Sequence, residues 1–412
     1  MKHNFLFLQG VNSPFFADLA QALKVSGQSV QRINFTAGDC VFWRRNGNAV
    51  RCKLAAQDLP EFFASHFTAN AISDVVLFGD ERPVHKAAVQ IAKQLGIRIH
   101  VFEEGYFRPY WVTLERGGVN ANSALPKDPS WYREMGRSVP NYDNGQAFSS
   151  SFFMRAWFDS AFHFCSLANR WLFPQYRYHS PVGAWQEYGP YLAKQTKQWM
   201  QQREKADTQK IEQLIECKQP FYLLPLQLDS DAQIRSHSSF SCMREVMGHV
   251  MASFVTHAPA DAVLVVKNHP LDMGLVNHEQ QALQLATQYD MADRMVFLQT
   301  GSMPVLLHHV RGVVTVNSTV GASSLLHKVP TMVMGQAIYN LPDLCYEGSL
   351  DDFWLELTPP DMALFQDFRN VVIHATQING GFYTASGIKM ALKNTVPQLL
   401  APQNFIEQHY GK

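Results

Sequence analysis

The sequence AVLVVKNHP, residues 262–270, joins an apolar run of the β type to a cluster of polar residues. The same pattern recurs in IRIHVFEEG, residues 97–105, and in GVVTVNST, residues 312–319. In open parallel sheets, ligands bind beyond the carboxyl ends of the strands, so residues there are the first candidates for chemistry. Polar residues also end strands without any further role. Because one cluster lies in the front half of the chain and two in the back half, a site that they share must span two domains.

The front half of the chain alternates between strand patterns and helix patterns. Strand patterns cover residues 5–8, 30–35, 75–78 and 97–102, and helix patterns cover residues 14–25 and 84–95. The turn Arg45-Asn46-Gly47-Asn48 between two apolar triplets predicts a small hairpin near 41–52. This alternation predicts a Rossmann-like α/β domain with a parallel sheet.

The alternation starts again in the back half. Strands are predicted at 221–226, 262–266, 295–298, 312–316 and 331–334, and helices at 241–256, 279–289, 304–309 and from Thr319 onward. This pattern predicts a second Rossmann-like domain. The tail is predicted to be helical, with a break at Gly380-Gly381, and to brace the first domain. The predicted domains are residues 1–185, 186–358 and the crossing tail 359–412.

Composition excludes several classes of protein. A chain of 412 residues predicts about two domains. Lys plus Arg equals Asp plus Glu at 35 each, so no net basic field favours nucleic acid. The six cysteines have no zinc-type spacing and are expected to be reduced thiols. The apolar residues 5–8 are too few for a signal sequence, and no apolar run has the length of a membrane span. We therefore expect a cytoplasmic protein.

Residues 149–173 form an unusually aromatic segment with the length of a helix and few charges. One interpretation is a buried helix between domains. The other is a face that accepts a lipid or rests on a membrane surface, with Arg155 and Arg170 available for phosphate. The sequence does not separate these two.

The polar clusters of the back half have the residue types that bind phosphate. Asn317, Ser318, Thr319 and Gly321 stand where a strand turns into a helix, so hydroxyls and free amides there can hold an anion. An ordinary N-cap explains the same residues.

The cluster at the end of 262–266 offers a charge and a directional donor. Lys267 supplies the positive charge, and His269, fixed by Pro270, supplies a directional donor. A structural histidine is the alternative. Donors from two strands of one domain would suit the phosphate of a nucleotide leaving group.

The acid pair Glu103-Glu104 is the candidate for catalysis. Adjacent residues of an extended chain point to opposite sides, so one acid is expected to react and the other to act as a brace. Gly105 allows a substrate to approach the backbone. A carboxylate here could act as general base in an inverting transfer or as nucleophile in a retaining one, and spacing does not decide between them.

Longer phrases of the front half carry a family resemblance. These are Phe7-Leu8-Gln9-Gly10, Phe15-Phe16-Ala17-Asp18-Leu19-Ala20, Arg32-Ile33-Asn34-Phe35 with Gly38-Asp39, and Glu103-Glu104-Gly105-Tyr106-Phe107-Arg108-Pro109 with Trp111-Val112-Thr113-Leu114-Glu115. The chain resembles the KpsS/LipB family of capsule polysaccharide proteins over most of its length. Its acid-acid-Gly, His-Pro and Ser-Thr motifs also resemble those of bacterial sialyltransferases and Kdo transferases that use CMP-activated sugars.

The resemblance implies a GT-B fold, in which two Rossmann-like domains face a central cleft, and a β-Kdo transferase. Such an enzyme moves Kdo from CMP-Kdo onto lysophosphatidylglycerol to start the linker of a capsule. In related retaining Kdo transferases the second acid of the motif is an aspartate that acts as nucleophile. Here that position is Glu104, and Asp39 remains a rival.

The resemblance also implies roles for the donor residues. His269 and Ser318-Thr319 should bind the CMP phosphate, and Lys267 should lie close to that phosphate or to the Kdo carboxylate. Gln227, Asp231 and His237 are expected to line the cleft, with surface solvation as the alternative.

Neither a metal nor another cofactor is expected, because a GT-B enzyme with these donors can neutralise the departing phosphate. Asp229-x-Asp231 has the spelling of a metal motif but is predicted to lie in a loop. The expected partners are CMP-Kdo, a lipid acceptor, a capsule biosynthesis complex and, by peripheral contact, the inner membrane. Two alternatives stay open: a nucleotide-sugar epimerase of GT-B architecture, and a non-catalytic capsule assembly or export component that binds lipid.

Overall fold

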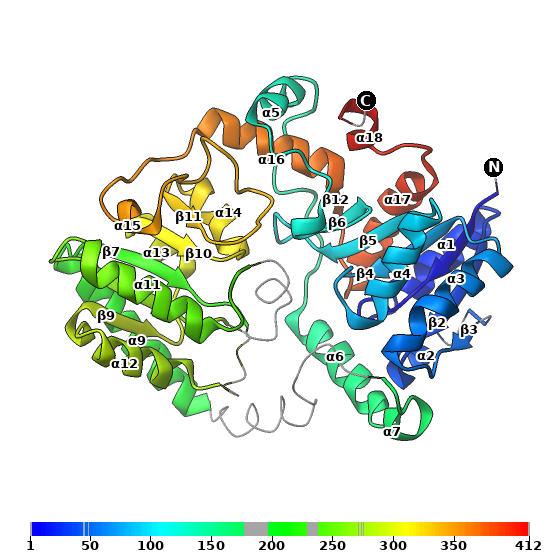
Figure 1. Cartoon of the computed structure of the whole chain (residues 1–412), viewed down its shortest axis with the longest axis horizontal. Helices are drawn as coiled ribbons and strands as arrows, with labels where there is room; N and C mark the ends of the chain where they lie inside the picture. Colours follow the sequence, from blue (N-terminus) through cyan, green and yellow to red (C-terminus); the bar gives the residue numbers. More distant parts are fainter. Residues whose placement is uncertain are drawn as a thin grey trace. The chain divides into compact units, whose positions relative to one another are not determined.

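The computed structural model describes residues 2–410, apart from 44–45, 48, 177–196, 229–237, 271, 273 and 275. The chain divides into two compact units (Figure 1). Unit 1 comprises Met1–Pro126, Gly136–His179 and Arg369–Lys412, and unit 2 comprises Lys127–Met135 and Ser180–Phe368. Residues 127–135, which we predicted for the front domain, and residues 359–368, which we predicted for the tail, thus belong to unit 2.

Unit 1 is built on a seven-stranded sheet with the order β12-β6-β5-β4-β1-β2-β3. Its strands are β1 (Asn4–Phe7), β2 (Ser29–Asn34), β3 (Ala49–Arg51), β4 (Asp74–Phe78), β5 (Arg98–Glu104), β6 (Trp111–Arg116) and β12 (Gln377–Asn379). The five strands from β3 to β5 pair in parallel, whereas β6 pairs antiparallel with both β5 and β12. The carboxyl ends of the five parallel strands therefore meet at one edge.

Helices cover both faces of this sheet. Phe5 and Phe7 pack in one core with residues of α1 (Phe15–Val25) and α17 (Ala385–Leu400). The alternate residues Leu6 and Leu8 pack in a second core with α3 (Leu59–Ala69) and α4 (Pro83–Gln94). Successive side chains of a strand point to opposite faces, so a short apolar run can supply both cores.

The predicted hairpin near 41–52 is wrong. Residues 37–43 form a helix, α2 (Ala37–Trp43), and β3 pairs in parallel with β2. The hydroxyl of Thr36 accepts the N–H of Asp39, and the carboxylate of Asp39 accepts the N–H of Thr36. This reciprocal capping starts a helix and overrides the β propensity of the apolar triplet that ends at Trp43.

The tail contains a strand that we did not predict. The tail consists of α16 (Met362–Thr376), β12, α17 and α18 (Phe405–His409). The unpredicted strand is β12, which forms one edge of the sheet of unit 1. Within unit 1, α17 packs against α1. Three residues are too few to show a strand pattern, so only pairing with β6 makes this segment a strand.

Unit 2 is a five-stranded sheet with the order β11-β10-β7-β8-β9, and all its pairings are parallel. Its strands are β7 (Phe221–Pro225), β8 (Val263–Lys267), β9 (Met295–Leu298), β10 (Gly312–Thr315) and β11 (Thr331–Val333). One face is covered by α11 (Met243–His257), α12 (His278–Gln288) and α15 (Leu350–Phe353), and the other by α9 (Lys197–Glu216) and α13 (Met303–His309).

The remaining elements are α5 (Pro129–Gly136), α6 (Phe152–Ser166), α7 (Asn169–Leu172), α14 (Thr319–Leu326) and the 3-10 turns Ala56–Asp58, Asn120–Asn122 and Ala292–Arg294. The prediction of an α/β fold with two Rossmann-like units, the units from which GT-B proteins are built, is confirmed. That the two sheets face a central cleft stays a prediction. Among the described helices, none is both long and apolar enough to cross a bilayer.

Candidate functional site

Three neighbouring strands of unit 2 carry the predicted donor residues at their carboxyl ends. Gln227 follows β7, Lys267 ends β8, and Asn317 follows β10. In the sheet, β7 lies between β10 and β8, and the chain runs outward from β7 in one direction before it returns to β10. The gap between β7 and β10 is therefore the topological switch point, where open α/β sheets bind their ligands.

Gln227 and Asn317 bridge this switch point. The side-chain oxygen of Gln227 accepts the backbone N–H of Asn317 at 3.0 Å, and Gln227 is buried. A Cβ on Gly335 would lie 2.2 Å from the side-chain oxygen of Asn317, so Gly335 leaves the room that Asn317 fills. The two polar residues fix the backbone at the start of α14. Of the other predicted lining residues, Asp231 and His237 lie outside the described residues.

Ser318 caps α14. Its hydroxyl accepts the N–H of Val320 at 3.2 Å, which is the ordinary N-cap role. The hydroxyl of Tyr339 donates to the carbonyl of Ser318, and a Cβ on Gly321 would lie 2.1 Å from that hydroxyl. Gly321 thus serves the close approach of Tyr339, and Thr319 is exposed at the first turn of the helix.

Lys267 is the most unusual residue of this edge. It is only 4% exposed, and burial lowers the pKa of its ammonium group. Its ammonium makes a long contact of 3.5 Å to the carbonyl of Asn268. Among the described residues, no carboxylate lies within ion-pair distance of its nitrogen. Asp207 attracts this charge from beyond ion-pair distance, so an anionic ligand would stabilise the buried ammonium further.

The loop after β8 is held by Asn268. Its side chain donates to Asp272 at 2.8 Å and to Gln299 at 3.1 Å, and it accepts the backbone N–H of His269 at 2.9 Å. His269 is half-buried, and Pro270 is exposed. We did not predict that Asn268 orders this loop, although it stands between two residues that we selected.

In unit 1, Glu104 lies at the end of β5 and contacts two distant residues. Its carboxylate lies 3.2 Å from the guanidinium of Arg155 on α6 and accepts a hydrogen bond of 3.1 Å from the hydroxyl of Tyr383. The guanidinium also stacks over the Tyr383 ring at 5.2 Å. Burial lowers the pKa of Arg155, but Glu104 together with Tyr383, Asp159 and Glu103 outweighs it, so the net shift of the pKa is upward. Burial and the same carboxylate raise the pKa of Tyr383.

A second carboxylate stands one helical turn beyond Arg155. Asp159 accepts a hydrogen bond of 3.0 Å from the side chain of Asn12, and burial raises its pKa. Arg155 and Asp159 therefore form a polar face of α6. We did not predict a role at this site for Asp159, Asn12 or Tyr383. The sequence did contain a signal: two residues of opposite charge, Arg155 and Asp159, stand four positions apart in an otherwise aromatic helix.

Glu103 has different surroundings from Glu104. One of its carboxylate oxygens accepts the backbone N–H of Glu104 at 2.9 Å, and the other lies 3.4 Å from where a Cβ of Gly79 would stand. Glu103 therefore orders the end of β5, while Glu104 reaches the α6 side chains. These contacts suit a brace at Glu103 and a reacting group at Glu104.

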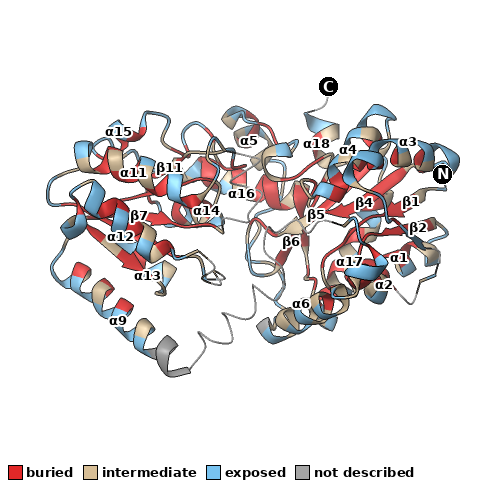
Figure 2. Cartoon of the chain, turned by 60° about the horizontal axis from the view of Figure 1, so that its bottom comes forward, coloured by how far each residue is buried: buried red, intermediate tan, exposed pale blue. Residues whose placement is uncertain are grey.

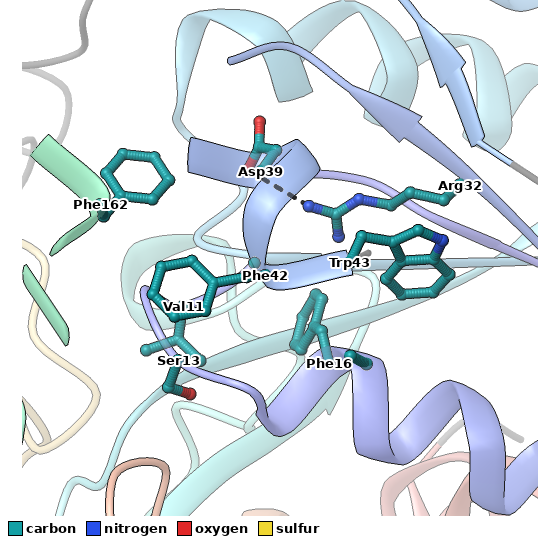
Figure 3. A pocket seen from close by; sticks show the side chains of 10 residues that line it. Val11, Ser13, Phe16, Arg32, Asp39, Phe42, Trp43 and Phe162 are labelled. Atoms are coloured by element: carbon teal, nitrogen blue, oxygen red, sulfur yellow. Dashed lines mark hydrogen bonds and ion pairs between the residues drawn. The ribbon is translucent and has the colours of Figure 1, made fainter. Parts of the chain in front are cut away.

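Asp39, the rival carboxylate, accepts bonds from several donors, and Figure 3 shows one of them, Arg32. It is 3% exposed and accepts hydrogen bonds from Phe35 N and Thr36 N at 3.0 Å and from the Gln9 side chain at 3.2 Å. It also forms a buried ion pair of 3.2 Å with Arg32. A carboxylate with this many donors is suited to holding the loop between β2 and α2 and has little freedom to react.

Clusters that could hold a metal ion are missing from the described part of the chain. The edge of unit 2 presents a buried ammonium and hydrogen-bonding side chains, and the edge of unit 1 presents a carboxylate held by Arg155 and Tyr383.

The protein has two Rossmann-like units, with a buried lysine at the switch-point edge of one and a held carboxylate on the other. Enzymes that handle nucleotide-linked substrates combine the same features. The family model described as "Capsule polysaccharide biosynthesis protein" matches residues 73–383. The chain belongs to this family.

Two curated relatives are similar over nearly the whole chain. The capsule polysaccharide export protein KpsS of Escherichia coli is 35% identical over 382 residues, which are 92% of this chain and 96% of that protein. The capsule polysaccharide modification protein LipB of Neisseria meningitidis serogroup B is 34% identical over 392 residues, 92% of each chain. Among solved structures, the β-Kdo 2,7-transferase of Thermosulfurimonas dismutans KpsC is 11% identical with a TM-score of 0.43, and the match covers 96% of this chain and all of that one.

Proposed function

We propose that the protein is a glycosyltransferase that moves Kdo from CMP-Kdo onto a lysophosphatidylglycerol acceptor at the start of a capsule linker. The observation that carries the proposal is the buried ammonium of Lys267 at the switch-point edge of unit 2. Its position beside the half-buried His269 suits the phosphate of CMP or the carboxylate of Kdo. Membership in the capsule polysaccharide biosynthesis family supports the same activity.

Each donor residue has a stated task in this proposal. Lys267 supplies the charge that neutralises the departing phosphate, and His269 supplies a directional hydrogen bond to it. Ser318 caps α14 and keeps the first turn of that helix in place. Thr319, exposed in that turn, presents its hydroxyl and amide to the same anion. No metal is needed to balance the phosphate charge.

Glu104 is the proposed nucleophile. Its carboxylate attacks the anomeric carbon of Kdo as the bond from that carbon to the phosphate oxygen breaks, and CMP leaves with the electron pair. The acceptor hydroxyl then forms the new bond, loses its proton to water and releases the carboxylate. Arg155 and Tyr383 hold the carboxylate oxygen in place from two directions.

The experiment that tests this function uses the purified full chain with CMP-Kdo and a short-chain lysophosphatidylglycerol, followed by mass spectrometry of the lipid. We expect one added Kdo, and we expect Glu104→Gln and His269→Ala each to abolish most of it. The control is His308→Ala, which removes an exposed histidine of unit 2. Absence of lipid-linked Kdo contradicts the proposal, and so does undiminished product from both Glu104→Gln and His269→Ala.

The products also distinguish the alternatives. An epimerase would return an altered sugar or nucleotide-sugar with no lipid product. A non-catalytic export component would leave CMP-Kdo intact while still binding the lipid, and the word "export" in the name of the Escherichia coli relative makes that outcome worth measuring.

A further inference from the structure

Helices α6 and α7 expose a row of large apolar side chains, here called the aromatic stripe. It consists of Phe153, Trp157, Phe164, Leu167 and Trp171, which are between 60% and 76% exposed. Their spacing of three, four or seven residues places them on one side of the helical segment. In Figure 2, α6 is drawn largely in the colours of exposed and intermediate residues. The interpretation of residues 149–173 as a buried helix is therefore wrong.

The opposite side of the same segment is packed against unit 1. Arg155 pairs with Glu104, and Phe162 stacks on Phe42 with ring centroids 6.3 Å apart. At the far end, the side chain of Asn169 accepts the backbone N–H of Ala37 at 2.8 Å. Contacts at both ends hold α6 and α7 in one orientation, so the outward position of the aromatic stripe is a feature of the fold.

The charges of this segment are sorted between the two sides. Asp159 is the only acidic residue between positions 149 and 176, and it bonds to Asn12 on the packed side. Arg170 is exposed beside the stripe. The outward surface thus combines aromatic rings with a positive charge and carries no carboxylate of its own segment. An anionic, partly apolar partner complements it.

The chemistry of the stripe favours a lipid surface over a second helix. Helices that pair through a seam use aliphatic knobs such as Leu, Ile and Val, and the two Trp and two Phe rings of the stripe do not fit that packing. Trp and Phe are the side chains that amphipathic helices place at the boundary between headgroups and acyl chains. We propose that the aromatic stripe docks the protein on the surface of an anionic lipid bilayer.

The inference rests on the proposed function, in which the acceptor is a lipid, and adds where that lipid meets the protein. Arg155 and Asp159 share α6 with the stripe, so the helix that would contact the membrane is the helix that holds Glu104.

The test is sedimentation of the full chain with sucrose-loaded vesicles. Vesicles of equimolar phosphatidylcholine and phosphatidylglycerol are compared with vesicles of phosphatidylcholine alone. We expect binding to the anionic vesicles, about tenfold weaker binding for the double variant Trp157→Ser/Trp171→Ser, and weaker binding for Arg170→Glu. The matched control is Leu283→Ser, which removes an exposed apolar side chain from α12 of unit 2 and should bind like the parent. Thermal melts show that each variant is folded.

Several outcomes would overturn the inference: no binding of the parent protein to either vesicle, binding that the folded double Trp variant retains, or a dimer in light scattering that this variant dissociates without any vesicle binding. The last result would assign the stripe to contact between two copies. Sedimentation needs no sugar transfer, so vesicle binding without a glycosylated product contradicts only the proposed function. Transfer to a soluble acceptor without vesicle binding contradicts only the proposal that the aromatic stripe docks on a membrane.

Discussion

The guanidinium of Arg155 lies 3.2 Å from the carboxylate of Glu104, across 51 positions of the sequence. This ion pair joins α6 to the carboxyl end of β5, and the hydroxyl of Tyr383 donates to the same carboxylate oxygen. One oxygen of Glu104 is thus oriented by two side chains from different parts of unit 1. A group held in this way can be placed accurately for attack on a bound substrate.

Arg155→Ala should reduce turnover without abolishing donor binding. Loss of the guanidinium frees the Glu104 carboxylate, and a misplaced reacting group costs about a hundredfold in rate. We expect kcat to fall by that order while the KM for CMP-Kdo changes little. Arg203→Ala is the control, because Arg203 and Glu279 form a pair of similar exposure on unit 2. Equal kinetic effects of the two variants would show that Arg155 has no special role.

Lys267→Met should weaken nucleotide binding and stabilise the empty protein. The substitution removes a buried charge that Asp207 attracts only from beyond ion-pair distance, so we expect the free energy of unfolding to rise by about 1 kcal/mol. The affinity for CMP should fall between about tenfold and a hundredfold, the range of one hydrogen bond to a charged group. Titration calorimetry and chemical denaturation measure the two effects.

The control for that variant is Lys127→Met in the same unit. The ammonium of Lys127 donates to the carbonyls of Ala337 and Ile338 at 2.6 and 3.3 Å. Its loss leaves two carbonyls without that donor, so stability should fall and CMP affinity should stay the same. Unchanged CMP affinity in Lys267→Met would remove Lys267 from the proposed donor site.

The strands of unit 2 could be predicted from sequence to within about a residue, and the reason is physical. Parallel strands covered on both faces are continuous apolar runs, and Met295–Leu298 and Gly312–Thr315 stand out between polar loops. The polar residues at the ends of these strands could be predicted as well, because they stand where each apolar run stops. By contrast, β12 has no pattern of its own and exists because Ile378 pairs opposite Val112.

The partners of the candidate carboxylate were beyond sequence reasoning. Tyr383 reaches Glu104 across 279 positions, and no local pattern encodes such a contact. The start of α2 is a different case, because Thr36-Ala37-Gly38-Asp39 spells the pattern of a capping box and could have excluded the hairpin. For α6, aromatic content alone did not tell which side was buried, since the stripe and the packed side are both aromatic.

Gly321→Ala should unfold the start of α14 locally. The new methyl would lie 2.1 Å from the Tyr339 hydroxyl, and removing that clash requires breaking the hydrogen bond from Tyr339 to Ser318. We expect a loss of stability of about 2 kcal/mol and weaker CMP binding. Gly248→Ala in α11 is the control, because its methyl would meet nothing closer than 3.8 Å and should stabilise the helix. The methyl would also lie 2.5 Å from a ring carbon that Phe retains, so partial rescue by Tyr339→Ala in the same chain would identify the clash as the cause.

Asp39→Asn and Glu104→Gln should separate a structural carboxylate from a reacting one. Asp39→Asn leaves the buried Arg32 without its ion pair, so the free energy of unfolding should fall by about 3 kcal/mol. The folded fraction should keep most of its transfer activity. Glu104→Gln should show the reverse, with nearly unchanged thermal stability and little product. If Asp39→Asn is stable but inactive, Asp39 is the reacting group.

Glu115→Gln should change how stability depends on pH. Glu115 is buried and accepts hydrogen bonds from Tyr106 at 2.6 Å and from Ser123. Burial raises its pKa to about 7, above the ordinary value of 4.5, so the folded state binds a proton that the unfolded state has already released between these values. The free energy of unfolding should therefore decline as pH rises through this window, by on the order of 3 kcal/mol, and then level off.

Glutamine resembles the protonated acid in shape and hydrogen bonding, so the contribution of this residue to the pH dependence should disappear in Glu115→Gln. Above pH 7 the variant should be the more stable protein, because the parent then holds a buried, ionised carboxylate. Denaturation with urea across the pH range measures the difference, with Glu347→Gln as an exposed control. Parallel pH profiles for parent and variant would show that Glu115 does not take up a proton on folding, and the two hydroxyl donors would then have outweighed its burial.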